Sequence, residues 1–174
     1  TQILDAARRS LLVAAVAASL AVCLGTLAGL ALARFGRFRG RGLLSLLTSA
    51  PLVMPEVMLG LSALLLFVSL DQLIGWPSRR GLSTITIAHV TFCICYVTVI
   101  VRSRLVQMDH SLEEAAMDLG ARPLRAFRLV TLPLIAPGLL AAFLLSFSLS
   151  LDDYVVSLFT AGETVTLPLY IAGA

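Results

Sequence analysis

Lysine is absent from this sequence, and only 13% of its residues are charged. Without lysine, the chain cannot form the phosphate-binding loop in which a glycine-rich turn precedes Lys and Ser or Thr. Histidine is scarce too, and His89 and His110 stand too far apart in sequence for a zinc-binding spacing. Neither lies near a recognisable nucleophile motif. We therefore expect no catalytic residue and no metal site in this chain.

The three cysteines, Cys23, Cys93 and Cys95, all lie inside apolar runs. Cys93 and Cys95 would face different sides of a helix, because residues two apart are not neighbours on its surface. This placement disfavours a disulfide or a metal site. We expect all three to be small, polarizable packing residues.

Hydrophobic residues are abundant and make up 59% of the chain, whereas soluble domains contain about 45–50% apolar and about 25% charged residues. A soluble domain of this length needs a polar shell, which this composition does not supply. Helices in lipid are apolar on their outer surface as well. The composition predicts an all-α fold, a polytopic transmembrane helix bundle with the lipid bilayer as a partner.

Four apolar stretches reach or approach the ~20 residues that cross a bilayer. They cover residues 10–33, 43–70, 82–101 and 134–151, and residues 164–174 resemble the start of a fifth. Pro51 and Pro55 interrupt the second stretch, which predicts a kink or a short helix before the span. We expect one transmembrane domain. We also expect an internal piece of a longer protein, because the chain begins without Met and ends inside an apolar stretch.

All 13 basic residues are arginines, and most of them lie in two predicted loops, residues 34–41 and 102–128. Because positive residues favour the cytoplasmic ends of spans, both loops are predicted to lie in the cytoplasm. An alternating path through the bilayer places them on the same side, as this orientation requires. The alternative for residues 34–41 is a patch for anionic lipid or nucleic acid. The flanking spans favour a topology signal, and we expect no nucleic-acid partner.

The predicted cytoplasmic loop, residues 102–133, begins with a short helix. Ser111 stands in the N-cap position with Glu114 three residues later, which is the capping-box arrangement. Gly120 is a candidate for the end of this helix. A second helix can begin at Pro123, and Pro133 is expected to end it at the membrane boundary. The loop is therefore predicted to be two short helices joined by a glycine-containing bend.

The first of these helices has the chemistry of a docking surface. Ala115 and Ala116 are small and let another surface approach closely, and Glu113, Glu114 and Asp118 can pair with basic residues of a partner. The alternative is an amphipathic helix resting on lipid headgroups. Such a helix has a basic polar face, whereas this one is acidic. The sequence therefore favours docking to a partner protein.

Within this loop, Glu114-Ala115-Ala116 is followed after three residues by Gly120, after nine more by Val130, and then by Leu132-Pro133. The pattern closely resembles the EAA signature of ABC-importer permeases, with Val130 where the family usually has Ile. The resemblance implies a type I ABC-importer permease fold and a loop that couples the subunit to an ATPase. The coupling residues it implies are Glu114, Ala115, Ala116, Asp118, Gly120, Leu132 and Pro133.

The resemblance also implies partners and a location. Family members are non-catalytic, multi-pass subunits of the bacterial inner membrane, and ATP is bound by a cytoplasmic ABC ATPase dimer. A second permease subunit and a periplasmic substrate-binding protein complete the importer. A complete family subunit has six spans, so this chain would be a fragment that lacks the first span and nearly all of the last.

Four further segments, residues 34–40, 50–56, 88–93 and 145–153, resemble the putrescine/spermidine subgroup of these permeases, and within it the second permease subunits of putrescine importers. The resemblance implies that the chain forms a path for polyamines. The alternatives are another substrate, such as ferric ion, sulfate or molybdate, and an ATPase-independent channel or scaffold. Acids in the path would raise the barrier to an anion.

A diamine carries two positive charges, so its path needs acids or aromatic faces. Glu56 follows Pro55 inside an apolar stretch, and an ionisable residue at membrane depth is a functional candidate. Asp152 and Asp153, followed by Tyr154, stand at the outer end of the fourth stretch. Adjacent acids face different sides of a helix, so one of the two is expected to face the path. Helix capping is the alternative for Glu56 and Asp152, and a marker of the outer membrane boundary is a further alternative for both aspartates.

Other residues are weaker candidates. Trp76 is expected to anchor at the membrane interface, and Phe92 and Tyr96 are expected to pack in the core, with path lining as the alternative. His89 near the start of the third stretch is expected to be a structural hydrogen-bonding residue.

Overall fold

The computed structural model describes residues 2–173, which form helices and no strand. In chain order the helices are α1 (Gln2–Arg34), α2 (Arg41–Val53), α3 (Glu56–Ile74), α4 (Leu82–Gln107), α5 (Ser111–Asp118), α6 (Pro123–Ala126), the π-helical turn η1 (Phe127–Thr131), α7 (Leu132–Asp152), α8 (Val155–Thr160) and α9 (Leu167–Gly173). Within this range, four helical segments are long and apolar enough to cross a membrane: α1, α3, α4 and the continuous run from Pro123 to Asp152. The prediction of an all-α transmembrane bundle is confirmed.

The predicted interruption of the second stretch is present. Met54 and Pro55 are extended, with ψ near 139° and 140°, and they separate the short helix α2 from the longer helix α3. Proline disfavours helical geometry in the residue before it, which favours the end of α2 at this point. Pro51, inside α2, has no N–H to donate to the carbonyl of Leu47. The thiol of Cys95 lies 3.8 Å from that carbonyl oxygen and donates to it instead.

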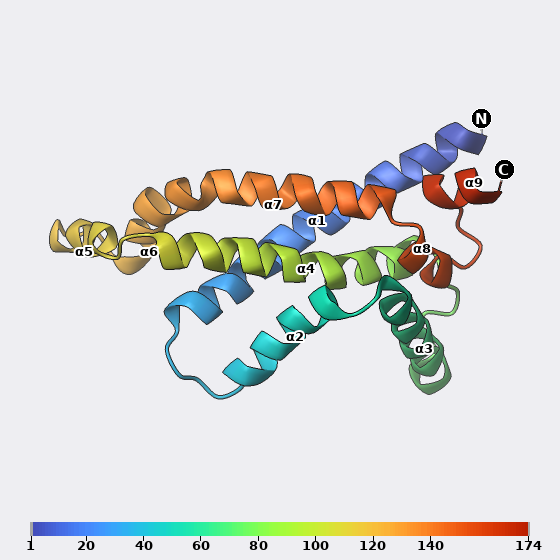
Figure 1. The fold of residues 1–174 in the computed structure, drawn as a ribbon, viewed down its shortest axis with the longest axis horizontal. Helices are drawn as coiled ribbons and strands as arrows, with labels where there is room; N and C mark the ends of the chain where they lie inside the picture. The colour runs from blue at the N-terminus through green and yellow to red at the C-terminus, as the bar shows by residue number, and fades with distance from the viewer. Residues whose placement is uncertain (1, 174) are drawn as a thin grey trace.

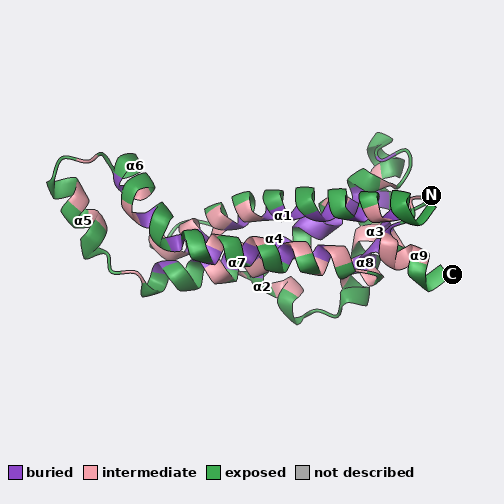
Figure 2. Ribbon diagram, turned by 90° about the horizontal axis from the view of Figure 1, so that it is seen from above, coloured by how far each residue is buried: buried purple, intermediate pink, exposed green. Residues whose placement is uncertain are grey.

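The core lies between α1, α4 and α7, which pack against one another, with α4 and α7 side by side and α1 crossing them obliquely (Figure 1). Figure 2 shows the same helices with their buried faces turned inward. Small residues of α1, among them Ala17, Ala21 and Gly25, are buried on this face. A Cβ atom on Gly25 would lie 2.6 Å from Cβ of Val97 on α4, so only glycine permits this approach. Membrane helices pack through small residues in this way, because lipid supplies no hydrophobic force between them.

Helix α3 stands away from this core and packs on α8 (Figure 1). It buries only Gly60 and Phe67, and a Cβ atom on Gly60 would lie 2.6 Å from the ring of Phe159. Most of its large apolar side chains therefore remain exposed, as a surface against lipid or a second subunit requires.

The α1–α2 loop and the connection through α5 and α6 lie at one end of the bundle, and both termini lie at the other (Figure 1). Both arginine-rich segments are thus on one side, as the predicted orientation requires. The loop of residues 102–133 is shorter than expected, because α4 continues to Gln107 and helix resumes at Pro123. Only residues 108–122 lie between these two helical runs.

The expectation that Pro133 ends a separate second helix is wrong. The helix that starts at Pro123 continues through Pro133 to Asp152. Just before the proline the backbone widens into η1, where Leu132 donates its N–H to the carbonyl of Phe127, five residues back. Pro133 follows in the first turn of α7, where a missing N–H is tolerated.

Candidate functional site

The short helix α5 begins one residue earlier than the sequence suggests. Ser111 is its first residue, and His110 occupies the N-cap position without a side-chain capping bond. The expected capping box at Ser111 is therefore wrong. Instead, Ser111 donates its backbone N–H to Oδ1 of Asp109 at 2.9 Å, and this bond lowers the pKa of the Asp109 carboxyl from its usual value.

Gly120 ends α5 as predicted. Its φ of 88° is left-handed, which glycine adopts without a steric penalty. Its N–H donates to the carbonyl of Met117 at 2.9 Å, and the N–H of Ala121 donates to that of Ala116 at 3.1 Å. These two bonds form the Schellman motif that terminates helices.

None of the residues of α5 is buried, and the helix projects from the end of the bundle (Figure 2). Glu114, Ala115 and Asp118 are exposed, with Glu114 and Asp118 one turn apart on the same side. Leu132 and Pro133 lie instead in the first turn of α7. The predicted coupling residues thus occupy two elements, and their role in coupling stays a prediction.

Glu113 differs from the other acids of α5 because its carboxylate is hydrogen-bonded to other residues of this chain. Its two carboxylate oxygens accept hydrogen bonds from Nη1 and Nη2 of Arg34, at 2.8 and 3.0 Å. The hydroxyl of Thr131 donates to the same carboxylate. From the sequence, Glu113 was predicted to pair with a partner protein, and Arg34 was predicted to be part of a topology signal. The pair joins residues 79 positions apart in the sequence, and no local sequence pattern predicts it.

All four residues predicted for the substrate path line one cavity of about 440 Å³. It lies between the α2–α3 break, α4, the end of α7 and the start of α8. The predicted residues and two aromatic residues of α4 that line it are Glu56, Asp152, Asp153, Tyr154, Phe92 and Tyr96. The cavity therefore combines three carboxylates with three aromatic rings. Among its described lining residues there is no arginine or histidine.

Glu56 owes its place in the cavity to the helix break. It is the first residue of α3, directly after the extended pair Met54 and Pro55, and it is exposed. A carboxylate in the first turn is favoured by the helix dipole. No side-chain hydrogen bond caps this helix, so the capping alternative for Glu56 does not describe the structure.

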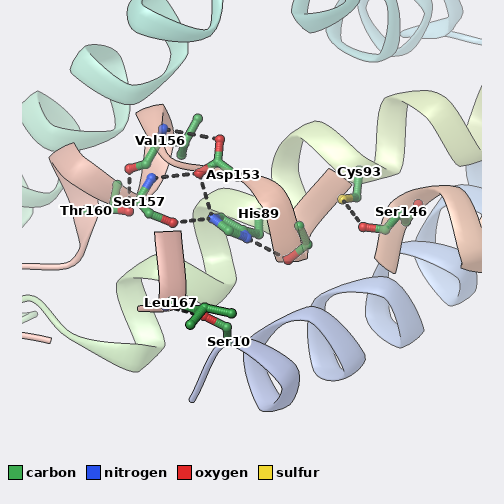
Figure 3. Close-up of polar contacts among 10 residues, drawn as sticks. Ser10, His89, Cys93, Ser146, Asp153, Val156, Ser157, Thr160 and Leu167 are labelled. Atoms are coloured by element: carbon green, nitrogen blue, oxygen red, sulfur yellow. Dashed lines mark hydrogen bonds and ion pairs between the residues drawn. The ribbon is translucent and has the colours of Figure 1, made fainter. Parts of the chain in front are cut away.

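The two adjacent aspartates have different surroundings, and Figure 3 shows those of Asp153. Asp153 accepts hydrogen bonds from the backbone N–H groups of Val156 and Ser157, at 3.3 and 2.8 Å, and therefore caps α8. Its Oδ2 also lies 3.2 Å from Nε2 of His89, and its side chain is only 6% exposed. Asp152 is exposed, and within residues 2–173 no hydrogen bond or ion pair engages its side chain. Of the two, Asp152 is the acid free to meet a solute.

His89 is a buried link between three helices. Its Nδ1 lies 2.6 Å from the hydroxyl of Ser150 on α7, and its Nε2 lies 3.1 Å from the hydroxyl of Ser157 on α8 (Figure 3). Its side chain is 1% exposed, so a structural role agrees with the geometry. The two serines were not singled out from sequence, because isolated hydroxyls in apolar helices carry no spacing signal. Over residues 2–173 no group of three or more metal-binding side chains is found.

Comparison with known proteins gives consistent matches. Residues 21–173 match a family described as the binding-protein-dependent transport system inner membrane component. The chain is 54% identical over 163 residues to the putrescine transport system permease protein PotI of Escherichia coli strain K12, covering 93% of this chain and 58% of that protein. It is 40% identical over 170 residues to the spermidine/putrescine transport system permease protein PotC of Haemophilus influenzae, covering 97% and 63%. The chain thus spans about three fifths of the length of these curated relatives.

Proposed function

Because the chain belongs to the family of binding-protein-dependent transport system inner membrane components, we propose that it is a permease subunit of an ATP-driven polyamine importer. In this proposal it forms part of the path for putrescine or spermidine through the bacterial inner membrane. It is itself non-catalytic. The names of its relatives PotI and PotC support the substrate class.

The cavity is the observation that carries the choice of a cationic substrate. A diamine loses hydration when it enters the membrane, and carboxylates compensate that loss by charge. Glu56 and Asp152 are the exposed acids of the cavity. Phe92, Tyr96 and Tyr154 add ring faces that attract ammonium groups. An anion would meet only unfavourable charge from the side chains of this lining, which weighs against sulfate or molybdate.

The partners belong to the proposal as well. We infer that α5 docks onto a cytoplasmic ABC ATPase dimer, which binds and hydrolyses the ATP. The absence of buried residues in this helix and its exposed acids, Glu114 and Asp118, support this role. The exposed apolar face of α3 supports packing against a second permease subunit. A periplasmic substrate-binding protein delivers the cargo at the other end of the bundle.

The test is reconstitution of the full-length subunit with its partner permease, ATPase and binding protein in proteoliposomes. ATP hydrolysis stimulated by the binding protein is measured with putrescine, spermidine, ferric ion and sulfate in turn. We expect stimulation and uptake with the polyamines alone. Stimulation by ferric ion or sulfate would assign another substrate, and uptake without ATP would indicate a channel.

A further inference from the structure

The start of α5 is held at the end of the bundle by one carboxylate. Glu113 accepts two hydrogen bonds from Arg34, the last residue of α1, in a bidentate ion pair whose side chains are 14% and 17% exposed. The hydroxyl of Thr131, a buried residue of η1, donates to the same carboxylate. Bidentate charged pairs are the most directional hydrogen bonds a protein makes, because they fix orientation as well as distance.

Arg34 is itself positioned by a neighbour. Its Nη1 lies 2.9 Å from Nε2 of His110, the residue that precedes α5. Arg34, His110, Glu113 and Thr131 therefore form one polar cluster, which we call the clamp. In the described part of the chain, Glu113 is the only residue of α5 whose side chain hydrogen-bonds to another helix. All side-chain hydrogen bonding between α5 and the bundle therefore passes through the clamp.

The chain itself joins α5 only to α4 and to the helical run that begins at Pro123. Helix α1 is far away in sequence, yet it packs along both α4 and α7 in the core. A displacement of α5 would reach α4 and α7 through the backbone. Among the side-chain hydrogen bonds of residues 2–173, the direct link from α5 to α1 runs through Arg34. The backbone links α5 to α4 and α7, and the clamp links it to α1 as well.

We propose that Glu113 is a positioning residue that makes α5 and α1 move as one body, so that a push on α5 displaces all three core helices together. The π-helical turn η1 contributes to the clamp through Thr131, whose hydroxyl donates a hydrogen bond to the carboxylate of Glu113. This inference rests on the proposed function, in which the ATPase pushes α5. Its physical core, a rigid link from α5 to α1, does not depend on the cargo.

Spin-label distance measurement tests the rigid link without cargo or ATP. Labels are placed at Phe35 and Leu119, which are 65% and 90% exposed and follow α1 and α5, in the full-length subunit with Cys23, Cys93 and Cys95 replaced by Ala. We expect one narrow distance distribution, which Glu113→Ala broadens. The exchange of both charges, Arg34→Glu with Glu113→Arg, restores it. A distribution that Glu113→Ala leaves unchanged overturns the proposal.

Transport stoichiometry tests the consequence. In the reconstituted importer, Glu113→Ala is expected to raise the ATP consumed per putrescine imported by about threefold or more, because about threefold lies near the lower end of the coupling between residues in one ion-pair network. The charge exchange restores the ratio, and Arg37→Gln, which removes an exposed arginine nearby, leaves it unchanged. A normal ratio in Glu113→Ala refutes the role in coupling. A wild-type complex that imports no putrescine refutes the proposed function instead, and the spin-label result then decides on the clamp.

Discussion

Replacing the two adjacent aspartates one at a time separates structure from transport. Asp153→Asn removes the charge that pairs with His89 and weakens the two bonds that cap α8. Hydrogen bonds to a charged group contribute about 1.5–3 kcal/mol each. Asparagine keeps one acceptor oxygen but not the charge, so we expect the contact with His89 and the two capping bonds to lose about 3 kcal/mol in total.

Thermal unfolding in detergent measures this loss. A change of 1 kcal/mol shifts the melting temperature of a chain of this size by about 2–4 °C, so Asp153→Asn should melt roughly 6–12 °C lower. Asp152→Asn removes the same charge from a side chain without a partner among residues 2–173, and it should melt within about 2 °C of the wild type. Its effect should appear in putrescine uptake, which we expect to fall about tenfold, or about 1.4 kcal/mol.

Comparison of Asp153→Asn with Asp152→Asn can refute the roles assigned to the two acids. Equal melting temperatures for Asp153→Asn and the wild type would show that the bonds to His89 and α8 carry no stability. A destabilised Asp152→Asn variant with normal uptake would reverse the assignment of the two acids. His89→Ala offers a second check, because it should lower the melting temperature about as much as Asp153→Asn, and the two losses should not add.

Three further predictions follow from the same geometry. Glu56→Gln should slow putrescine uptake while co-purification with the ATPase stays normal; unchanged uptake kinetics would remove Glu56 from the path. Gly120→Pro should separate ATP hydrolysis from transport, because proline cannot adopt a φ of 88°, whereas undiminished transport would refute the coupling role of α5. Gly25→Ala should lower the melting temperature by an equivalent of about 1–3 kcal/mol through overpacking against Val97, and Gly42→Ala, whose Cβ atom would meet nothing within 4 Å, should not.

Composition and apolar run length were sufficient to predict the helical membrane bundle. A chain with 59% hydrophobic residues has few other ways to satisfy its backbone in lipid. The break before α3 was also predictable, because Pro55 disfavours helical geometry in the residue before it. The same holds for Gly120, whose place at the end of α5 follows from the left-handed conformation that glycine tolerates.

Some local patterns misled, because other bonds replaced the predicted ones. Ser111 resembled an N-cap, yet the carboxylate of Asp109 meets its backbone N–H and the helix begins at Ser111 itself. Pro133 resembled a helix end, yet the widened turn η1 lets the helix continue through it. Whether a proline ends a helix or joins its first turn depends on how the preceding backbone bonds are closed, and sequence spacing does not contain that information.

The helical segments, the break before α3 and the acids within apolar surroundings could be predicted from the sequence alone, because they follow from local sterics and from the cost of charge in lipid. The contacts of each acid depend on how the helices pack. Asp153 is held by His89 and the start of α8, Asp152 is left free in the cavity, and Glu113 is paired with Arg34. These assignments join residues far apart in the chain, and their partners become fixed only when the helices pack.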